Sequence, residues 1–271
     1  MAYTKISFII LTWNSEKYIE KCLASIENMT GIDKEIFVVD NGSTDLTKSI
    51  LKKHDISAIF LDKNMGTTYP RNLAIKKCGK DSEFICILDS DTEINERAFI
   101  NMVNILRSDK TYGIIGPKMY NKNNILQVTA KKFPTVKIKL FKAIPFGNFH
   151  DKGTRLEHYN FDQNADYSIV DYIISACWLI KREVAEKIGL LDEKIFYSPE
   201  DVDYCIRAWQ SGFKVLYAQN CSIIHDTQRI SKKKFFSYIN YTHVKGLIYY
   251  FIKHKYWFNA PNTDKWGDIK K

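Results

Sequence analysis

Polar residues that could bind a nucleotide or a divalent cation stand directly after three apolar runs in the first third of the sequence. They are, in chain order, Thr12 and Asn14, Asp40 and Asn41, and Asp89-Ser90-Asp91. Two carboxylates two residues apart can share Mg²⁺ or Mn²⁺, which prefer oxygen ligands and bridge phosphates. Taken alone, Asp91 could equally well belong to the start of a helix near Asn95. Because polar residues follow three successive expected strands, we expect these residues to line one shared crevice at the strand ends.

Three further groups of residues could complete such a crevice. Arg71 lies in the first turn of an expected helix, where the dipole disfavours a cation unless an anion such as phosphate lies nearby; the alternative is an exposed surface arginine. Asp201 beside Glu200 could be a general base kept ionised by the dipole of the helix that they open, or both could only stabilise that helix start. His225 ends another apolar run and could be a neutral metal ligand or a structural histidine.

The elements that must position these residues follow from the apolar pattern. Strands are expected at 6–11, 35–39, 57–61, 84–88 and 113–117, alternating with helices at 16–29, 43–51, 69–78 and 96–106, with Ser43-Thr44 capping the second helix. Continuous apolar strands are buried on both faces, which predicts an α/β fold with a mainly parallel sheet flanked by helices. Ligands of such sheets bind at the carboxyl ends of the strands.

The second half of the body is less regular. Residues 119–167 are rich in lysine (Lys131, Lys132, Lys137, Lys139 and Lys142) and predict strands and a mobile loop. Regular structure is expected again over 169–182, with helices over 183–188 and 201–211 and two short strands over 213–217 and 222–224. Gly212 should end the second of these helices.

Read together, these segments resemble the inverting family 2 glycosyltransferases with the GT-A nucleotide-diphospho-sugar transferase fold. The resemblance runs from about Lys5 to His225. It rests on residues 8–14, 38–45, 64–72, 88–91 and 175–182, and on Glu200-Asp201-Val202-Asp203 followed by 212–215. Their order and spacing together are specific, although each segment alone is modest.

The resemblance implies a role for each matching residue. Thr12, Asn14, Asp40 and Asn41 would form the pocket for base and ribose, Asp89 and Ser90 would touch the nucleotide, and Asp91 would hold Mn²⁺ or Mg²⁺ on the diphosphate with Asp89 and His225. Asn64 and Arg71 would face the donor, Ala176, Cys177 and Trp178 would lie near donor sugar and acceptor, and Asp201, with Glu200, would deprotonate the acceptor hydroxyl. Residues 67–72 lack the glycine-rich stretch of the rhamnosyl-like subgroup, which leaves the donor sugar open.

The expected activity is therefore metal-dependent transfer of a sugar, with inversion, from a UDP- or dTDP-linked donor. The acceptor would be a hydroxyl of a glycan, lipid-linked or protein-linked molecule in the synthesis of cell-surface polysaccharide or glycoconjugate. A dehydrogenase would need G-x-G-x-x-G after the first strand, and a nucleotidyltransferase a glycine-rich basic loop; residues 12–16 have neither. A non-catalytic binder of nucleic acid or an anionic surface would leave the acidic strand ends without a role.

The charge divides the chain into two parts. The net charge is +9, yet residues 229–271 hold ten Lys or Arg against two Asp, together with eleven aromatic residues. We therefore expect a catalytic domain over 1–228 and a basic, aromatic, helical extension over 229–271, with Ser231 as a plausible helix cap. The extension could contact anionic lipid, stack on single-stranded nucleic acid, or pack on the body; nucleic acid is the least favoured.

Location is predicted from what the sequence lacks. There is no C-x-x-C pair among the six cysteines, no recognisable signal peptide, and no apolar run of the length a bilayer span needs. Buried reduced thiols and a cytoplasmic protein are expected, with peripheral contact at the inner face of the membrane through residues 229–271.

Overall fold

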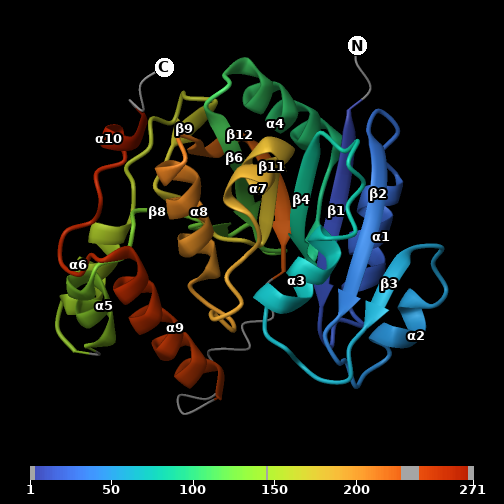
Figure 1. Ribbon diagram of the computed structural model, residues 1–271, viewed down its shortest axis with the longest axis horizontal. Helices are drawn as coiled ribbons and strands as arrows, with labels where there is room; N and C mark the ends of the chain where they lie inside the picture. Colours follow the sequence, from blue (N-terminus) through green and yellow to red (C-terminus); the bar gives the residue numbers. More distant parts are fainter. Residues whose placement is uncertain (1–3, 145, 227–237, 268–271) are drawn as a thin grey trace.

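The computed structural model describes residues 4–144, 146–226 and 238–267. One mixed sheet forms the centre, with the strand order β3-β2-β1-β4-β11-β6-β12-β5, while β7 pairs with β6 and β9 with β12 (Figure 1). Its strands are β1 (Lys5–Thr12), β2 (Asp33–Asp40), β3 (Ser57–Phe60), β4 (Phe84–Asp89), β5 (Thr92–Glu93), β6 (Tyr112–Tyr120), β7 (Leu126–Gln127), β9 (Tyr167–Ile169), β11 (Cys177–Lys181) and β12 (Lys214–His225). A two-stranded sheet joins β8 (Ala130–Lys131) to β10 (Tyr172–Ile173).

The first half of the sheet confirms the predicted parallel core. Strand β1 pairs in parallel with β2 on one side and β4 on the other. Phe8 and Ile10 enter one hydrophobic cluster and Ile9 the cluster on the opposite face, so the run has to be apolar at every position. Strand β11 is the antiparallel insertion between β4 and β6, and β12 runs parallel to β6. The carboxyl ends of β1, β2, β4, β6 and β12 therefore meet at one edge.

Helices cover both faces of the sheet. They are α1 (Ile19–Glu27), α2 (Thr47–Leu51), α3 (Thr68–Ile75), α4 (Glu96–Ser108), α5 (Val136–Ala143), α6 (Phe149–Glu157), α7 (Arg182–Ile188), α8 (Glu200–Gln210), α9 (Tyr238–His254) and α10 (Asp264–Gly267). Helices α1 and α4 pack on one face through Leu23 and Phe99, and α7 and α8 pack on the other through Val184 and Tyr204. All six cysteines are unpaired and five of them are buried, as predicted.

Residues 119–167 contain the expected short strands, β7 and β8, but differ from the prediction because they also form two helices, α5 and α6. Thr135 caps α5 by accepting a hydrogen bond from the backbone N–H of Ile138, and α6 packs beside α5. The lysines that gave this segment a loop-like composition instead converge on a buried carboxylate. Glu157 is 1% exposed and pairs with Lys131, Lys139 and Lys142.

Two smaller predictions are also wrong. Residues 213–224 do not form two strands, because β12 is continuous from Lys214 to His225 and absorbs its irregularity as a bulge between Ala218 and Ser222. Ser43-Thr44 does not cap α2, which begins at Thr47. The carboxylate of Asp45 accepts from the Thr47 N–H at that helix start.

The basic aromatic extension is described only from residue 238 to 267, so Ser231 and residues 229–237, like residues 268–271, lie outside the described part. Helix α9 packs on the body through Tyr250 and Phe251, which share a hydrophobic cluster with Trp178 and Tyr204. Lys253 forms ion pairs with Asp192 and Asp203. Within the described residues, no helix combines the length and apolar character that crossing a bilayer requires.

Candidate active site

Two acidic side chains and one imidazole meet at the carboxyl edge of the sheet. Asp89 is the last residue of β4, Asp91 follows in the turn to β5, and His225 is the last residue of β12. The antiparallel pair β5–β12 places His225 opposite Thr92 and so brings the imidazole beside Asp91. One potential ligand atom of each residue lies within 4.8 Å of the others, and His225 Nε2 is 3.4 Å from Asp91 Oδ1. This is a donor set suited to a divalent cation.

Gln127 on β7 fixes the orientation of the imidazole. Its amide nitrogen donates to the backbone carbonyl of His225 (2.7 Å), which turns its amide oxygen toward Nδ1 of the same residue (2.8 Å). Nδ1 must then carry a proton, and in the neutral ring Nε2 presents its lone pair toward Asp91. Burial alone would lower the pKa of His225, but Asp91 and Asp89 outweigh it and raise the pKa. No local sequence pattern marks this contact, because the two residues are 98 positions apart.

Thr12 and Asp40 provide buried polar atoms at the neighbouring strand ends. Both are almost fully buried, at 1% and 0% exposure. Asp40 accepts from the Ser43 N–H through Oδ1, whereas its Oδ2 and the Thr12 hydroxyl have no hydrogen-bond partner among the described residues. Buried polar atoms are costly without partners, so this pair is suited to a ligand that donates and accepts hydrogen bonds.

The asparagines and the serine predicted to touch the nucleotide hold the surrounding loops. Asn14, in the left-handed region at φ +50°, accepts from the Thr44 N–H. Asn41 donates to the Gly66 carbonyl and accepts from the Met65 N–H, while Asn64 accepts from the Gly66 N–H. Ser90 is buried and shares a hydrogen bond with Ser15. These four residues hold in place the loops that follow β1, β2 and β4.

Arg71 lies inside the site and is not a surface arginine. Its side chain is 2% exposed and donates to Asp89 (2.7 Å), Glu200 (3.1 Å) and the Ser175 hydroxyl (2.9 Å). Two carboxylates of the protein, Asp89 and Glu200, are thus anions that justify a cation in the first turn of α3. Burial alone would lower the pKa of Arg71, but Asp89 and Glu200 raise it.

Glu200 and Asp201 stand in the first turn of α8, as predicted, but their ionisation differs from the expectation. Burial, together with the Asp201 charge, raises the pKa of Glu200 to about 7. Burial also raises the pKa of Asp201, against the hydrogen bond from the Val202 N–H and the charges of Lys131 and Lys139. Loss of water around the Asp201 carboxylate therefore opposes the stabilisation of its charge that is expected from the helix dipole.

Residues 176–178 are buried next to Asp89 and support it through the backbone. The Ala176 carbonyl accepts from the Asp89 N–H at 2.9 Å. Cys177 and Trp178 begin β11 and have no exposed surface, and the Trp178 indole donates to the Ile173 carbonyl and stacks on Tyr204. The predicted contact of Cys177 and Trp178 with donor or acceptor is therefore replaced by a packing role.

Comparisons with known proteins identify the family to which the chain is similar. The sequence model described as glycosyl transferase family 2 matches residues 7–189. A curated relative is the low-salt glycan biosynthesis hexosyltransferase Agl10 of Haloferax volcanii, 26% identical over 85% of this chain and 69% of its own length. Another, the cholesterol galactosyltransferase of Borreliella burgdorferi, is 22% identical over 80% of this chain and 58% of its own length.

Solved structures share the fold at low identity. The mannosyltransferase PcManGT of Pyrobaculum calidifontis in complex with GDP-Man and Mn²⁺ aligns over 98% of this chain and 68% of its own, with a TM-score of 0.63 and 17% identity. TarS of S. aureus in complex with UDP-GlcNAc aligns over 86% and 62%, with a TM-score of 0.56 and 19% identity. The chain thus spans only part of the length of each of these relatives. The predicted GT-A fold is confirmed.

Proposed function

Because the chain belongs to glycosyl transferase family 2, we propose that it transfers a sugar, with inversion, from a UDP- or dTDP-linked donor to a hydroxyl of an acceptor. The acceptor would be a glycan, lipid-linked or protein-linked molecule in the synthesis of cell-surface polysaccharide or glycoconjugate. The observation that carries the proposal is the Asp89–Asp91–His225 triad, joined through Arg71 to the Glu200-Asp201 pair. Cation ligands and a candidate base thus lie together at the ligand-binding edge of the sheet.

The nucleoside of the donor would bind at the ends of β1 and β2. The unpartnered Thr12 hydroxyl and Asp40 Oδ2 can accept hydrogen bonds from base N–H or ribose hydroxyl groups. The loop held by Asn41 and Asn64 forms the adjoining rim. Thr12 and Asp40 are the pair we assign to direct nucleotide contact.

The triad residues fit Mn²⁺ or Mg²⁺. Asp89 and Asp91 supply carboxylate oxygens and His225 an imidazole nitrogen whose orientation Gln127 fixes, a set that suits Mn²⁺ in particular. When bound, such an ion neutralises charge that develops on the departing nucleoside diphosphate. Arg71 holds one Asp89 oxygen in place, which leaves the other oxygen of that carboxylate to face the ligand.

Asp201 is the residue we assign as the base that accepts the proton of the attacking hydroxyl, with Glu200 as its partner. Glu200 is fixed by Arg71 and the Ser175 hydroxyl, so its main role is to orient Arg71. A base whose pKa is raised toward neutrality takes a proton more readily in the transition state. General-base catalysis of this kind contributes roughly 10²- to 10⁴-fold in rate.

Helix α9 supports peripheral membrane contact through the C-terminal extension. Its outer side carries Tyr241, Val244, Ile248 and Ile252, exposed at 66, 56, 51 and 60%. The spacing of three or four residues puts them on one stripe of the helix, with exposed Lys245 beside it. We propose that this stripe rests on the cytoplasmic face of a membrane that holds the acceptor, while Tyr250 and Phe251 anchor the helix to the body.

The test is metal-dependent donor binding and turnover. Calorimetric titration with UDP and with dTDP, with and without Mn²⁺, and hydrolysis of UDP- and dTDP-sugars would be compared for wild type, Asp91→Ala and Asp201→Asn. Asp91→Ala should abolish the metal dependence of nucleotide binding. Asp201→Asn should keep nucleotide binding and lose turnover by about 10²-fold or more.

The control is Asp151→Asn, because Asp151 is a highly exposed carboxylate of α6. It should match wild type in both measurements. If neither nucleotide binds to wild type with or without Mn²⁺, the transferase proposal fails, and the alternative of a non-catalytic nucleic-acid or anionic-surface binder takes its place. Full activity of Asp201→Asn would remove that residue from the role of base.

A further inference from the structure

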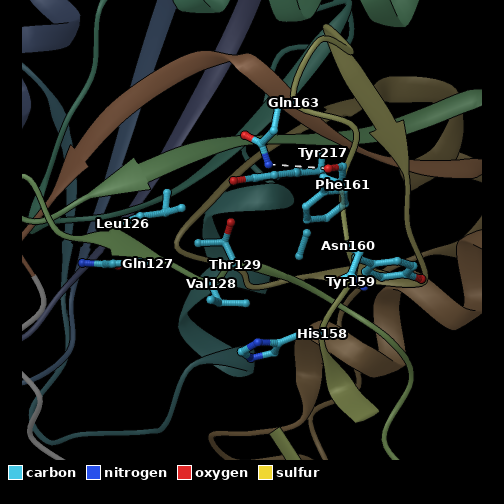
Figure 2. A pocket seen from close by; sticks show the side chains of 11 residues that line it. Leu126, Gln127, Val128, Thr129, His158, Tyr159, Asn160, Phe161, Gln163 and Tyr217 are labelled. Atoms are coloured by element: carbon cyan, nitrogen blue, oxygen red, sulfur yellow. Dashed lines mark hydrogen bonds between the residues drawn. The ribbon is translucent and has the colours of Figure 1, made fainter. Parts of the chain in front are cut away.

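A pocket of 340 Å³ lies beyond the triad, between the β7–β8 segment and the chain that follows α6 (Figure 2). It is lined by Leu126–Ala130 from the first segment, by residues 158–161 and Gln163 from the second, and by Tyr217 of β12. Its volume falls in the range of about 300–1,000 Å³ that is usual for small-molecule sites. Nothing assigned so far to donor, cation or base uses it.

The wall of this pocket is aromatic. The rings of Tyr159 and Phe161 stack at 5.5 Å with 26° between their planes, and Phe161 meets Tyr217 at 5.0 Å and 36°. The position of Tyr159 is fixed by two hydrogen bonds, because its hydroxyl donates to the Asp171 carboxylate and accepts from the backbone N–H of that residue. The ring faces are therefore held in place before any ligand binds, which lowers the entropic cost of binding.

The polar groups of the pocket are neutral. Among the described residues that line it there is no Asp, Glu, Lys or Arg; the polar side chains are amides, hydroxyls and one imidazole. Burial and the charges of Lys131 and Lys142 lower the pKa of that imidazole, His158, so it is uncharged at neutral pH. No cationic side chain among these lining residues would face a bound phosphate or carboxylate, and Lys132 lies behind the wall, 5.5 Å from the centre of the Tyr159 ring. Aromatic faces beside amide and hydroxyl groups match a neutral sugar ring, which has C–H faces and a hydroxyl rim.

The position of the pocket indicates which sugar it would take. Along the sheet edge the order is β2 and β1 with Asp40 and Thr12, then β4 with Asp89, and lastly β12 with His225. Gln127 of β7 connects the pocket to the triad, because it lines the pocket and also binds His225. The pocket therefore lies on the far side of the triad from the proposed nucleoside site, where the acceptor has to approach.

We propose that this pocket binds an uncharged sugar unit of the acceptor glycan against its wall of aromatic rings. The inference rests on the proposed function, because it names the acceptor chemistry of that same site. Tyr159, Phe161 and Tyr217 supply the aromatic wall, Gln163 supplies hydrogen-bonding groups, and Val128 lies in the lining with 44% of its surface exposed. An acceptor with a sugar unit next to the attacking hydroxyl is selected over a simple alcohol.

The experiment is saturation-transfer difference NMR on the full chain with UDP and Mn²⁺ held at saturation. The probes are methyl glycosides of glucose, galactose, mannose and N-acetylglucosamine. Val128→Trp fills the pocket, and Phe161→Leu keeps the bulk but removes the flat ring. Phe60→Ala is the control, since Phe60 is an aromatic residue with 39% of its surface exposed on the far edge strand β3. Thermal melting of each variant confirms that it is folded.

The proposal expects transfer to ring C–H protons of at least one glycoside in wild type and Phe60→Ala. Affinity should fall about three- to tenfold in Phe161→Leu, the range of a lost aromatic contact, and the signal should vanish in Val128→Trp. No signal in wild type, or an unchanged signal in Val128→Trp, overturns it. Displacement of the glycoside by a UDP-sugar but not by UDP would assign the pocket to the donor sugar and overturn the acceptor assignment.

Donor hydrolysis, measured on the same proteins, distinguishes failure of the pocket proposal from failure of the transferase proposal. The pocket variants should hydrolyse the donor at the wild-type rate, because neither residue touches the triad, Arg71 or Asp201. Hydrolysis without glycoside binding would refute only the pocket. Absence of donor binding in wild type would instead refute the transferase proposal.

Discussion

Glu157→Gln probes the buried carboxylate that orders the α5–α6 hairpin. Glu157 is 1% exposed, and its oxygens lie 2.5 Å from Lys142 Nζ, 3.4 Å from Lys139 Nζ and 3.7 Å from Lys131 Nζ. Burial alone would raise the pKa of Glu157, but the three ammonium groups outweigh it and lower the pKa to about 2. A neutral amide of the same shape removes that attraction and leaves three cations facing one another.

The expected loss of folding free energy follows from the shift in the pKa of Glu157. A fall in pKa from 4.5 to about 2, at about 1.4 kcal/mol per unit, corresponds to about 3 kcal/mol of folding free energy at neutral pH. Loss of one partner from a buried ion pair costs a similar 3–5 kcal/mol or so. Because the folded-state pKa is the lower one, this stability is present above pH 4.5 and is lost as the pH falls from 4.5 toward 2.

Urea denaturation at a series of pH values between 7 and 2 is the assay. At pH 7 the free energy of unfolding of Glu157→Gln should be about 3 kcal/mol below wild type, and the two curves should converge below pH 4. Glu186→Gln on α7 removes an exposed carboxylate and should follow wild type throughout. A difference below about 1 kcal/mol at pH 7, or one that does not shrink on acidification, would refute the reasoning.

Two further predictions concern the sheet edge. Gln127→Ala should weaken Mn²⁺ binding about 10- to 100-fold at saturating UDP, because the imidazole of His225 loses the contact that fixes its ring; calorimetric Mn²⁺ titration measures it, and unchanged affinity would contradict it. Asp40→Asn keeps an oxygen for the Ser43 N–H but loses the charge on the unpartnered Oδ2, so UDP affinity should fall about 10- to 100-fold in fluorescence or calorimetric titration, with no change in melting temperature.

The first 118 residues could be interpreted from sequence because their signal is local. Strands such as β1 are apolar at every position when both faces are covered, and the polar residue after each strand marks the ligand-binding edge. Asp89 and Asp91 can be placed at this edge because they stand at the end of an apolar run and just after it. His225 can be placed in the same way, because it is the polar end of another apolar run, β12.

The α5–α6 hairpin could not be interpreted in this way, because its decisive interactions are distant in sequence. Lys131, Lys139 and Lys142 have the composition of a solvated loop until Glu157 is placed among them. The same holds for Gln127, whose role depends on a residue 98 positions away. Composition indicates the usual environment of a residue type, and three half-buried lysines around a buried carboxylate are an exception to it.

Arg71 links the two halves of the proposed chemistry. One guanidinium nitrogen binds Asp89 on the cation side, and the other binds Glu200, the neighbour of the candidate base. A planar fork can hold both carboxylates at fixed positions, whereas a single ammonium group cannot. One buried side chain on α3 therefore sets the position of the proposed base relative to the proposed cation ligands, through contacts with Glu200 and Asp89, which lie 129 and 18 residues away from it in the sequence. This accounts for a buried arginine in the first turn of a helix, where its charge would otherwise be unfavourable.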